Sequence, residues 1–186
     1  TSSTDTEAYG DLYQWGRASD GHEKRNTGTT TNLSATDTPG HADFILAPTG
    51  SKDWRSTPND NLWQGVDGMN NPCPAGFRLP TEAEWEGELQ SWSSSNSEGA
   101  FGSPLKLPVA GYRNRSDGSL NDVGLLGFYW SGSAIGTVSS SVDGSVASRL
   151  RFTNGDASVI SVTRASGFSV RCTKDEYSLE VALRGN

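Results

Sequence analysis

The chain has 186 residues, the size of a single domain, and a formal net charge of −7 at pH 7. This charge disfavours nucleic acid and anionic membranes as partners, since both need clustered Lys and Arg, and no segment is apolar for long enough to span a bilayer. Six Trp and 22 Gly predict a loop-rich fold whose core depends on aromatic side chains.

The N-terminal part of the chain is polar, with few regular patterns. Residues 1–8 are rich in Thr and Ser, and we expect a flexible N-terminus there. Tyr9–Arg17 has apolar residues at positions 9, 12 and 13 and Gly at position 16, which is consistent with a short helix ending at the glycine. Residues 18–43 predict a long loop, and Phe44-Ile45-Leu46 predicts a short edge strand.

Residues 49–71 predict an irregular loop held in place by buried Trp54 and Trp63. Side chains in this loop that could offer oxygen ligands to calcium are Asp53, Asn59, Asp60, Asn61, Asp67, Asn70 and Asn71. Asp and Asn beside Gly and Pro are more often turn formers than ligands, so we expect turns here. We therefore expect no cofactor, and a calcium ion in this loop would have a structural role only.

A rigid turn followed by a helix start is predicted after residue 71. Prolines and a glycine within residues 72–80 disfavour regular structure before the helix. Thr81 and Glu84 have the spacing of a capping box, in which each side chain accepts a hydrogen bond from the other residue's backbone amide. An apolar stripe on the predicted helix is formed by Trp85, Leu89 and Trp92.

The C-terminal half contains strand-like segments near Val109–Tyr112, Phe128–Ser131, Ser148–Thr153, Ser158–Val162 and Phe168–Cys172. Arg149, Arg151 and Thr153 alternate with Leu150 and Phe152, which predicts one inward and one outward face. The facing of residues 158–162 stays undecided. Between Val109 and Arg171 there is no Lys, Glu, Gln or Met. Strands and tight turns disfavour Glu and Lys, but this explains the missing Gln and Met less well.

Three spaced motifs support a family resemblance. They are Arg78-Leu79-Pro80-Thr81-Glu82-Ala83-Glu84-Trp85-Glu86 with Cys73-Pro74-Ala75-Gly76 before it, Leu107-Pro108-Val109-Ala110-Gly111-Tyr112-Arg113, and Gly167-Phe168-Ser169-Val170-Arg171-Cys172. In these residues the chain resembles the formylglycine-generating-enzyme branch of the C-type lectin fold, and more closely the Fibrobacter succinogenes major paralogous domain. The resemblance covers residues 9–175 and implies an α+β, loop-rich C-type lectin-like fold with small antiparallel sheets and two helices.

The cysteines and histidines bear on catalysis. Cys73 and Cys172 are too far apart for a CxxC redox or zinc pair, and two buried thiols are an alternative to a bridge. The resemblance implies a disulfide, because lectin-like folds commonly tie a helix region to the last strand. Formylglycine-generating enzymes use cysteines near a C-terminal groove, and Cys172 is the only candidate here. His22 and His41 lie in polar loops, where histidine is usually solvated, so we expect no enzyme.

The family also offers an interpretation of the missing residue types. Some lectin-like domains of this kind are variable proteins of diversity-generating retroelements, which replace template adenines at random, mainly in Asn codons. Such changes cannot produce Lys, Glu, Gln, Met or Trp, and residues 109–171 lack all of these except Trp130. The resemblance thus implies a non-catalytic display protein, extracellular on a bacterial cell or phage virion, that binds a protein or glycan ligand on a cell surface.

Under this hypothesis two sets of residues interleave within the C-terminal half. The framework positions are Leu107, Tyr112, Gly127, Tyr129, Trp130, Leu150, Phe152, Phe168 and Arg171. The display positions, which would contact ligand, are Arg115, Asp117, Asn121, Asp122, Leu125, Leu126, Phe128, Ile135, Arg149, Arg151, Thr153, Asp156, Ser158, Ile160, Val162 and Thr163. The run Leu125-Leu126-Gly127-Phe128 is expected to be exposed, which suits an interface better than an inert surface.

Two other functions remain open. The first is a non-diversified bacterial surface domain of the same fold, acting as a scaffold or associated with carbohydrate. The second is an oxidase similar to the formylglycine-generating enzymes. Residues 176–186 follow the last motif and form a C-terminal extension, for which a strand, a packing helix and an assembly element are all open.

Overall fold

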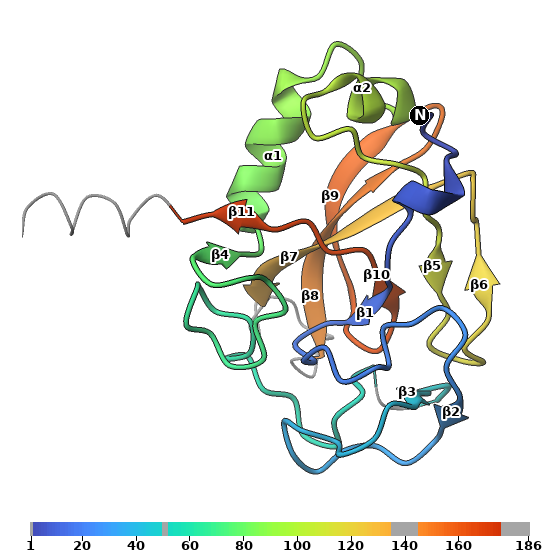
Figure 1. Ribbon diagram of the computed structural model, residues 1–186, viewed down its shortest axis with the longest axis vertical. Helices are drawn as coiled ribbons and strands as arrows, with labels where there is room; N and C mark the ends of the chain where they lie inside the picture. The colour runs from blue at the N-terminus through green and yellow to red at the C-terminus, as the bar shows by residue number, and fades with distance from the viewer. Residues whose placement is uncertain (1, 50–51, 135–144, 176–186) are drawn as a thin grey trace, which may run out of the picture.

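The computed structural model describes residues 2–49, 52–134 and 145–175 (Figure 1). In these residues the fold is α+β, with two α-helices and several small sheets joined by long loops, which confirms the expected class. The helices are α1 (Glu82–Ser91) and α2 (Ser97–Gly102), and a 3-10 turn, η1, spans Thr6–Ala8. No helix among the described residues has the length and apolar character needed to cross a membrane.

The strands of the described residues form four sheets. An antiparallel three-stranded sheet contains β7 (Gly127–Ala134), β8 (Val146–Phe152) and β9 (Ala157–Thr163). A four-stranded sheet has the order β1 (Tyr13–Gln14), β10 (Gly167–Phe168), β5 (Tyr112–Arg113) and β6 (Leu120–Asn121). The remaining pairs are β4 (Phe77–Arg78) with β11 (Thr173–Lys174), and β2 (Thr29–Thr30) with β3 (Phe44–Ile45). The β2–β3 pair is parallel, so the expectation of antiparallel sheets alone is wrong there.

Helix α1 begins as its sequence predicts. Thr81 is the N-cap, its hydroxyl accepts from the Glu84 amide at 3.2 Å, and the Glu84 carboxylate accepts from the Thr81 amide at 2.7 Å. The buried Trp85 indole donates to the Trp130 carbonyl at 3.1 Å. The helix therefore packs on the sheet of β7, β8 and β9, as Figure 1 shows.

The three-stranded sheet separates two aromatic clusters, one on each face. The cluster under α1 contains Trp85, Trp92, Tyr129, Leu150 and Phe152. The cluster on the opposite face contains Trp15, Trp54, Trp63, Phe128, Trp130 and Phe168. Trp54 and Trp63 are buried in this second cluster, as expected for their loop. Leu150 faces α1, as the alternation along β8 predicts, but the opposite face of β8 is also largely buried.

The predicted helix over Tyr9–Arg17 is wrong. Gly10 and Gly16 have φ angles of 64° and 81°, outside the range of a right-handed helix. The Leu12 amide donates to the Glu23 carbonyl at 2.9 Å, and the Trp15 amide donates to the Arg164 carbonyl at 3.1 Å. The backbone of this segment therefore pairs with other segments of the chain. The second helix is instead α2, in a stretch whose polar composition suggests a connector. Within the first eight residues η1 forms, and the Ser3 carbonyl accepts from the Val109 amide at 2.9 Å.

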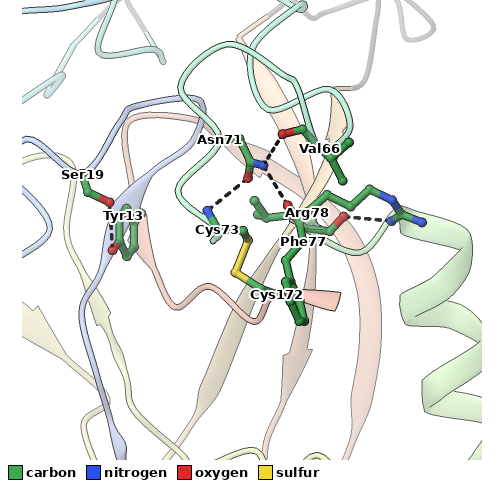
Figure 2. Close-up of a disulfide and its surroundings, with 9 residues drawn as sticks. Tyr13, Ser19, Val66, Asn71, Cys73, Phe77, Arg78 and Cys172 are labelled. Atoms are coloured by element: carbon green, nitrogen blue, oxygen red, sulfur yellow. Dashed lines mark hydrogen bonds between the residues drawn. A yellow bond between two sulfur atoms is a disulfide. The ribbon is translucent and has the colours of Figure 1, made fainter. Parts of the chain in front are cut away.

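A disulfide joins Cys73 to Cys172, the pairing that the resemblance implies (Figure 2). It ties the turn before α1 to the segment that leads into β11, next to the β4–β11 pair. The Asn71 side chain fixes this turn, because Oδ1 accepts from the Cys73 amide at 3.1 Å and Nδ2 donates to the carbonyls of Val66 and Phe77, each at 2.9 Å. The Pro- and Gly-rich run is thus an ordered turn.

Candidate functional site

A hollow of about 410 Å³, here called the Arg149 pocket, opens where β5, β7, β8, β9 and β10 meet. Half of the display positions line it, namely Arg115, Asp122, Leu126, Phe128, Arg149, Arg151, Val162 and Thr163. They come from strands and loops that are distant in the chain. The fold thus gathers these residues around one concavity.

Strand register explains why the residues converge. Arg149 lies opposite Trp130 on β7 and Ile160 on β9, and Arg151 lies opposite Phe128 and Ser158. Residues directly opposite in antiparallel strands point to the same face of a sheet. This face carries Phe128, Arg149, Arg151, Ser158, Ile160 and Val162, while Leu150 and Phe152 face α1. The facing of β9, which the sequence leaves undecided, is therefore set by its pairing with β8.

The Arg149 guanidinium lies over two aromatic rings. Its central carbon is 4.7 Å from the ring centre of Phe128 and 5.0 Å from that of Phe168. The two rings stack with centres 5.3 Å apart. A cation above aromatic faces is attracted by their quadrupoles, so the rings form an apolar floor that favours this position for the guanidinium.

Arg149 has no polar partner among the described residues, although it is only 8% exposed. Its Nε and Nη1 atoms are buried without a hydrogen-bond acceptor. Burial, together with the positive charge of Arg151, lowers the pKa of Arg149 to about 10. A buried charge without a counterion is unfavourable, so this side chain is poised to gain from an anion.

The neighbouring charges are already engaged. Arg151 Nη1 lies 2.7 Å from Asp156 Oδ2, and the Thr153 hydroxyl donates to the other oxygen of that carboxylate at 2.5 Å. These contacts, that of Thr153 first, lower the pKa of Asp156. Arg115 donates to the Ala47 carbonyl. Among the described cations of the pocket, Arg149 is therefore the one without a hydrogen bond or ion pair.

Several expectations about exposure are wrong. Leu125 is 66% exposed, but Phe128 in the same run is only 4% exposed, because its ring packs on Phe168. Thr153 and Arg149 are also buried, although the strand alternation placed them outward. Arg171, expected in the framework, is exposed and donates to the Leu105 carbonyl at 2.6 Å.

The other display positions that the structure describes are not among the residues that line the pocket. Asp117 and Asn121 lie in the β5–β6 hairpin, where the exposed Asp117 accepts from the Ser119 amide at 2.9 Å. Ile160 is 42% exposed on β9, beside Arg149. Ile135 lies outside the described residues.

Some pocket residues were not expected to contact ligand: Tyr112, Asn114, Ser166 and Phe168. Tyr112 and Phe168 belong to the family motifs, and we therefore assigned both to the framework. No sequence signal marked Asn114 or Ser166 as a pocket residue. They reach the pocket because β10 pairs with β5, a contact between distant segments that local patterns do not show.

The expectation that His22 is a solvated loop residue is wrong. The imidazole is fully buried, with Nε2 accepting from the Gln14 amide at 3.1 Å and Nδ1 lying 2.7 Å from Asp20 Oδ1. Burial lowers the pKa of His22. His22, Asp20 and Glu23 are close enough to share a metal ion, with ligand atoms within 4.8 Å of one another. Both ring nitrogens are already hydrogen-bonded, however, so the cluster has a structural role.

Side chains of the 49–71 loop form turns. Asp53 Oδ1 accepts from the Arg55 amide and Asn59 Oδ1 from the Asn61 amide, each at 3.0 Å. Asn70 Nδ2 donates to the Gly16 carbonyl at 2.9 Å. These contacts agree with the turn interpretation of the Asp- and Asn-rich sequence.

Comparison with models of known protein families, with curated proteins and with solved structures found no match. The geometry of the Arg149 pocket therefore carries the functional argument.

Proposed function

We propose that the protein is a non-catalytic ligand-binding display protein with a C-type lectin-like fold, diversified by a retroelement over residues 109–171. One observation carries the proposal: half of the display positions, chosen from composition and motifs, line a single pocket. Positions assigned to the framework on the same strands, such as Leu150 and Phe152, pack under α1 instead. Variation at the pocket would therefore leave that cluster intact.

The arrangement suits recognition without covalent chemistry. Long strands hold the pocket floor, while the β5–β6 hairpin and the segment 121–126 supply its rim. Rigid elements that support variable loops are a common design for binding surfaces. Aromatic residues and Arg supply most of the energy at such surfaces, and both types are present here.

The cysteines and the buried histidine support the non-catalytic assignment. Cys172, the candidate oxidase thiol, is bridged to Cys73, and His22 is engaged by Gln14 and Asp20. A structural disulfide is also typical of proteins outside the reducing cytosol. We therefore propose an extracellular location, on a bacterial surface or a phage virion, and a protein or glycan ligand on a cell surface.

Sequencing the coding DNA from many isolates tests the proposal. We expect replacements to concentrate at adenine-rich template codons for the pocket-lining display positions, sparing Trp130, Leu150 and Phe152. The segment 71–107 of the same clones is the internal control, because it lies outside the proposed variable region. Replacements scattered evenly across both segments, without preference for adenine, would contradict retroelement diversification and favour a fixed surface domain.

A further inference from the structure

The buried positive charge of Arg149 has no counterion in the part of the chain that the structure describes. The side chain is more than nine-tenths buried, lines the pocket, and makes no hydrogen bond or ion pair with a described residue. Arg113 provides a contrast within the same protein. It is also buried and lies over the ring of Phe44, yet its guanidinium donates to carbonyls of Lys24, Thr27 and Gly118.

An anionic group in the pocket would supply the missing partner. Guanidinium groups bind carboxylates through parallel hydrogen bonds, which are stronger than bonds between neutral groups. The stacked rings of Phe128 and Phe168 shield the site from below, which strengthens an ion pair by lowering the local dielectric. Asp122 also lines the pocket and repels an anion more strongly the more charge it carries, so a monoanion fits better than a dianion such as phosphate.

We propose that the Arg149 pocket binds the carboxylate of an Asp or Glu side chain presented by a protein ligand, with Arg149 as its partner. This inference rests on the proposed function, since it names the ligand chemistry of the same surface. The surroundings favour a protein over an acidic sugar. Leu125 and Ile160, next to the pocket lining in the chain and in the sheet, are 66% and 42% exposed, and such apolar groups pack better on protein side chains than on hydroxyl-rich glycans.

Peptide selection on the full chain tests this inference. A random peptide library displayed on phage is panned against the immobilised protein, and enriched peptides are synthesised as pairs that differ only by Glu→Gln or Asp→Asn. We expect enrichment of one acidic position, and weakening by about tenfold or more when that position is made neutral, which corresponds to the loss of a charged hydrogen bond. Arg149→Met should remove the difference within each pair.

Arg171→Met is the matched control, because Arg171 is exposed, lies outside the pocket lining and carries the same charge. It should keep the preference for the acidic peptide. Peptides that bind in the pocket without acidic preference would overturn the inference while leaving the proposed function intact. Binding that no substitution in the pocket affects would instead overturn the proposed function at this site.

A second measurement uses the unmodified protein, so it does not depend on the folding of a variant. N-acetylglutamate amide is titrated while the Nε–Hε signal of Arg149 is followed by NMR, with N-acetylglutamine amide as the neutral probe. We expect a saturable shift with the acidic probe only, and the same response to both probes would overturn the inference. Sialyllactose and lactose form the sugar arm, and binding confined to sialyllactose would overturn the assignment to a protein ligand.

Discussion

The Arg78 guanidinium and the Glu84 carboxylate form a two-point ion pair, with Nη1–Oε2 and Nη2–Oε1 distances of 2.8 and 2.9 Å. Glu84 also accepts from the Thr81 amide at 2.7 Å, so one carboxylate closes the capping box and joins β4 to α1. The Arg78 hydrogen bond lowers the pKa of Glu84 to about 2. Glu84 is therefore central to the motif that begins the helix.

Replacing Glu84 should destabilise the protein at neutral pH. We expect Glu84→Gln to lower the free energy of unfolding by about 1 kcal/mol, because it weakens the cap and removes the ion pair. Glu86→Gln, exposed on the same helix, should stay within about 0.5 kcal/mol of the parent. Urea unfolding at neutral pH measures both variants, and equal losses would contradict a special role for Glu84.

Acidic pH should reduce the difference in stability between the parent and Glu84→Gln. The folded-state pKa of Glu84, about 2, is below its ordinary value of 4.5, so its contribution is present above pH 4.5 and is lost as the pH falls toward 2. The gap between the parent and Glu84→Gln should therefore narrow over that interval. A gap that widens in acid would contradict the assignment.

Removing the disulfide should lower the free energy of unfolding more than Glu84→Gln does. The Cys73–Cys172 bridge closes a separation of 99 residues, and chain-entropy arguments assign about 3–5 kcal/mol to such a long loop. We expect the double variant Cys73→Ala/Cys172→Ala to lose stability in this range, measured by urea unfolding. A reductant should shift the parent midpoint but leave that of the variant unchanged. A parent that is insensitive to reductant after unfolding and refolding would show that the bridge contributes little.

The buried imidazole of His22 should make stability depend on pH. Protonation would remove the Nε2 acceptor of the Gln14 amide, and burial already holds the pKa of His22 below 6.5. The unfolded chain then binds more protons, so stability falls as the pH drops below about 6.5, by at most about 1.4 kcal/mol per pH unit. His22→Gln should flatten this slope between pH 6.5 and 4.5, whereas His41→Gln, exposed in its loop, should retain it. Equal slopes in all three proteins would contradict the prediction.

Protonation of Asp20 should lower the stability further at more acidic pH. Burial alone would raise its pKa, but the hydrogen bond from His22 and the charge of Arg17 lower it to about 2. Its contribution is present above the ordinary pKa of 3.8 and is lost as the pH falls toward 2. We expect Asp20→Asn to be less stable than the parent at pH 6 and to approach it below pH 3. A difference that stays constant over this range would contradict the role of the carboxylate.

Local sequence predicted the features whose partners are close in the chain. The cap of α1 is one example, because Thr81 and Glu84 satisfy each other within one turn. The helix expected at Tyr9–Arg17 failed because Leu12 and Trp15 find backbone partners in distant segments. Local sequence also did not predict that Arg149 is buried. Alternation placed it outward from α1, but the rings of Phe128 and Phe168 that cover it come from other strands.

Arg149 and Arg113 should respond to the same substitution in opposite ways. Both guanidinium groups are buried over Phe rings, but only that of Arg113 is held by hydrogen bonds. Arg113→Met removes a buried side chain that holds three partly buried carbonyls and should lower the free energy of unfolding by about 2–4 kcal/mol.

Arg149→Met removes a buried charge that has no partner among the described residues, so the free energy of unfolding should stay unchanged or rise by about 1 kcal/mol. The loss of the cation–π contacts with Phe128 and Phe168 limits the gain. Urea unfolding of the two variants side by side gives the comparison. A loss above about 2 kcal/mol for Arg149→Met would show that the residue supports the fold. Stability retained together with lost selectivity for acidic peptides would mean that the chain keeps an unfavourable buried charge for binding.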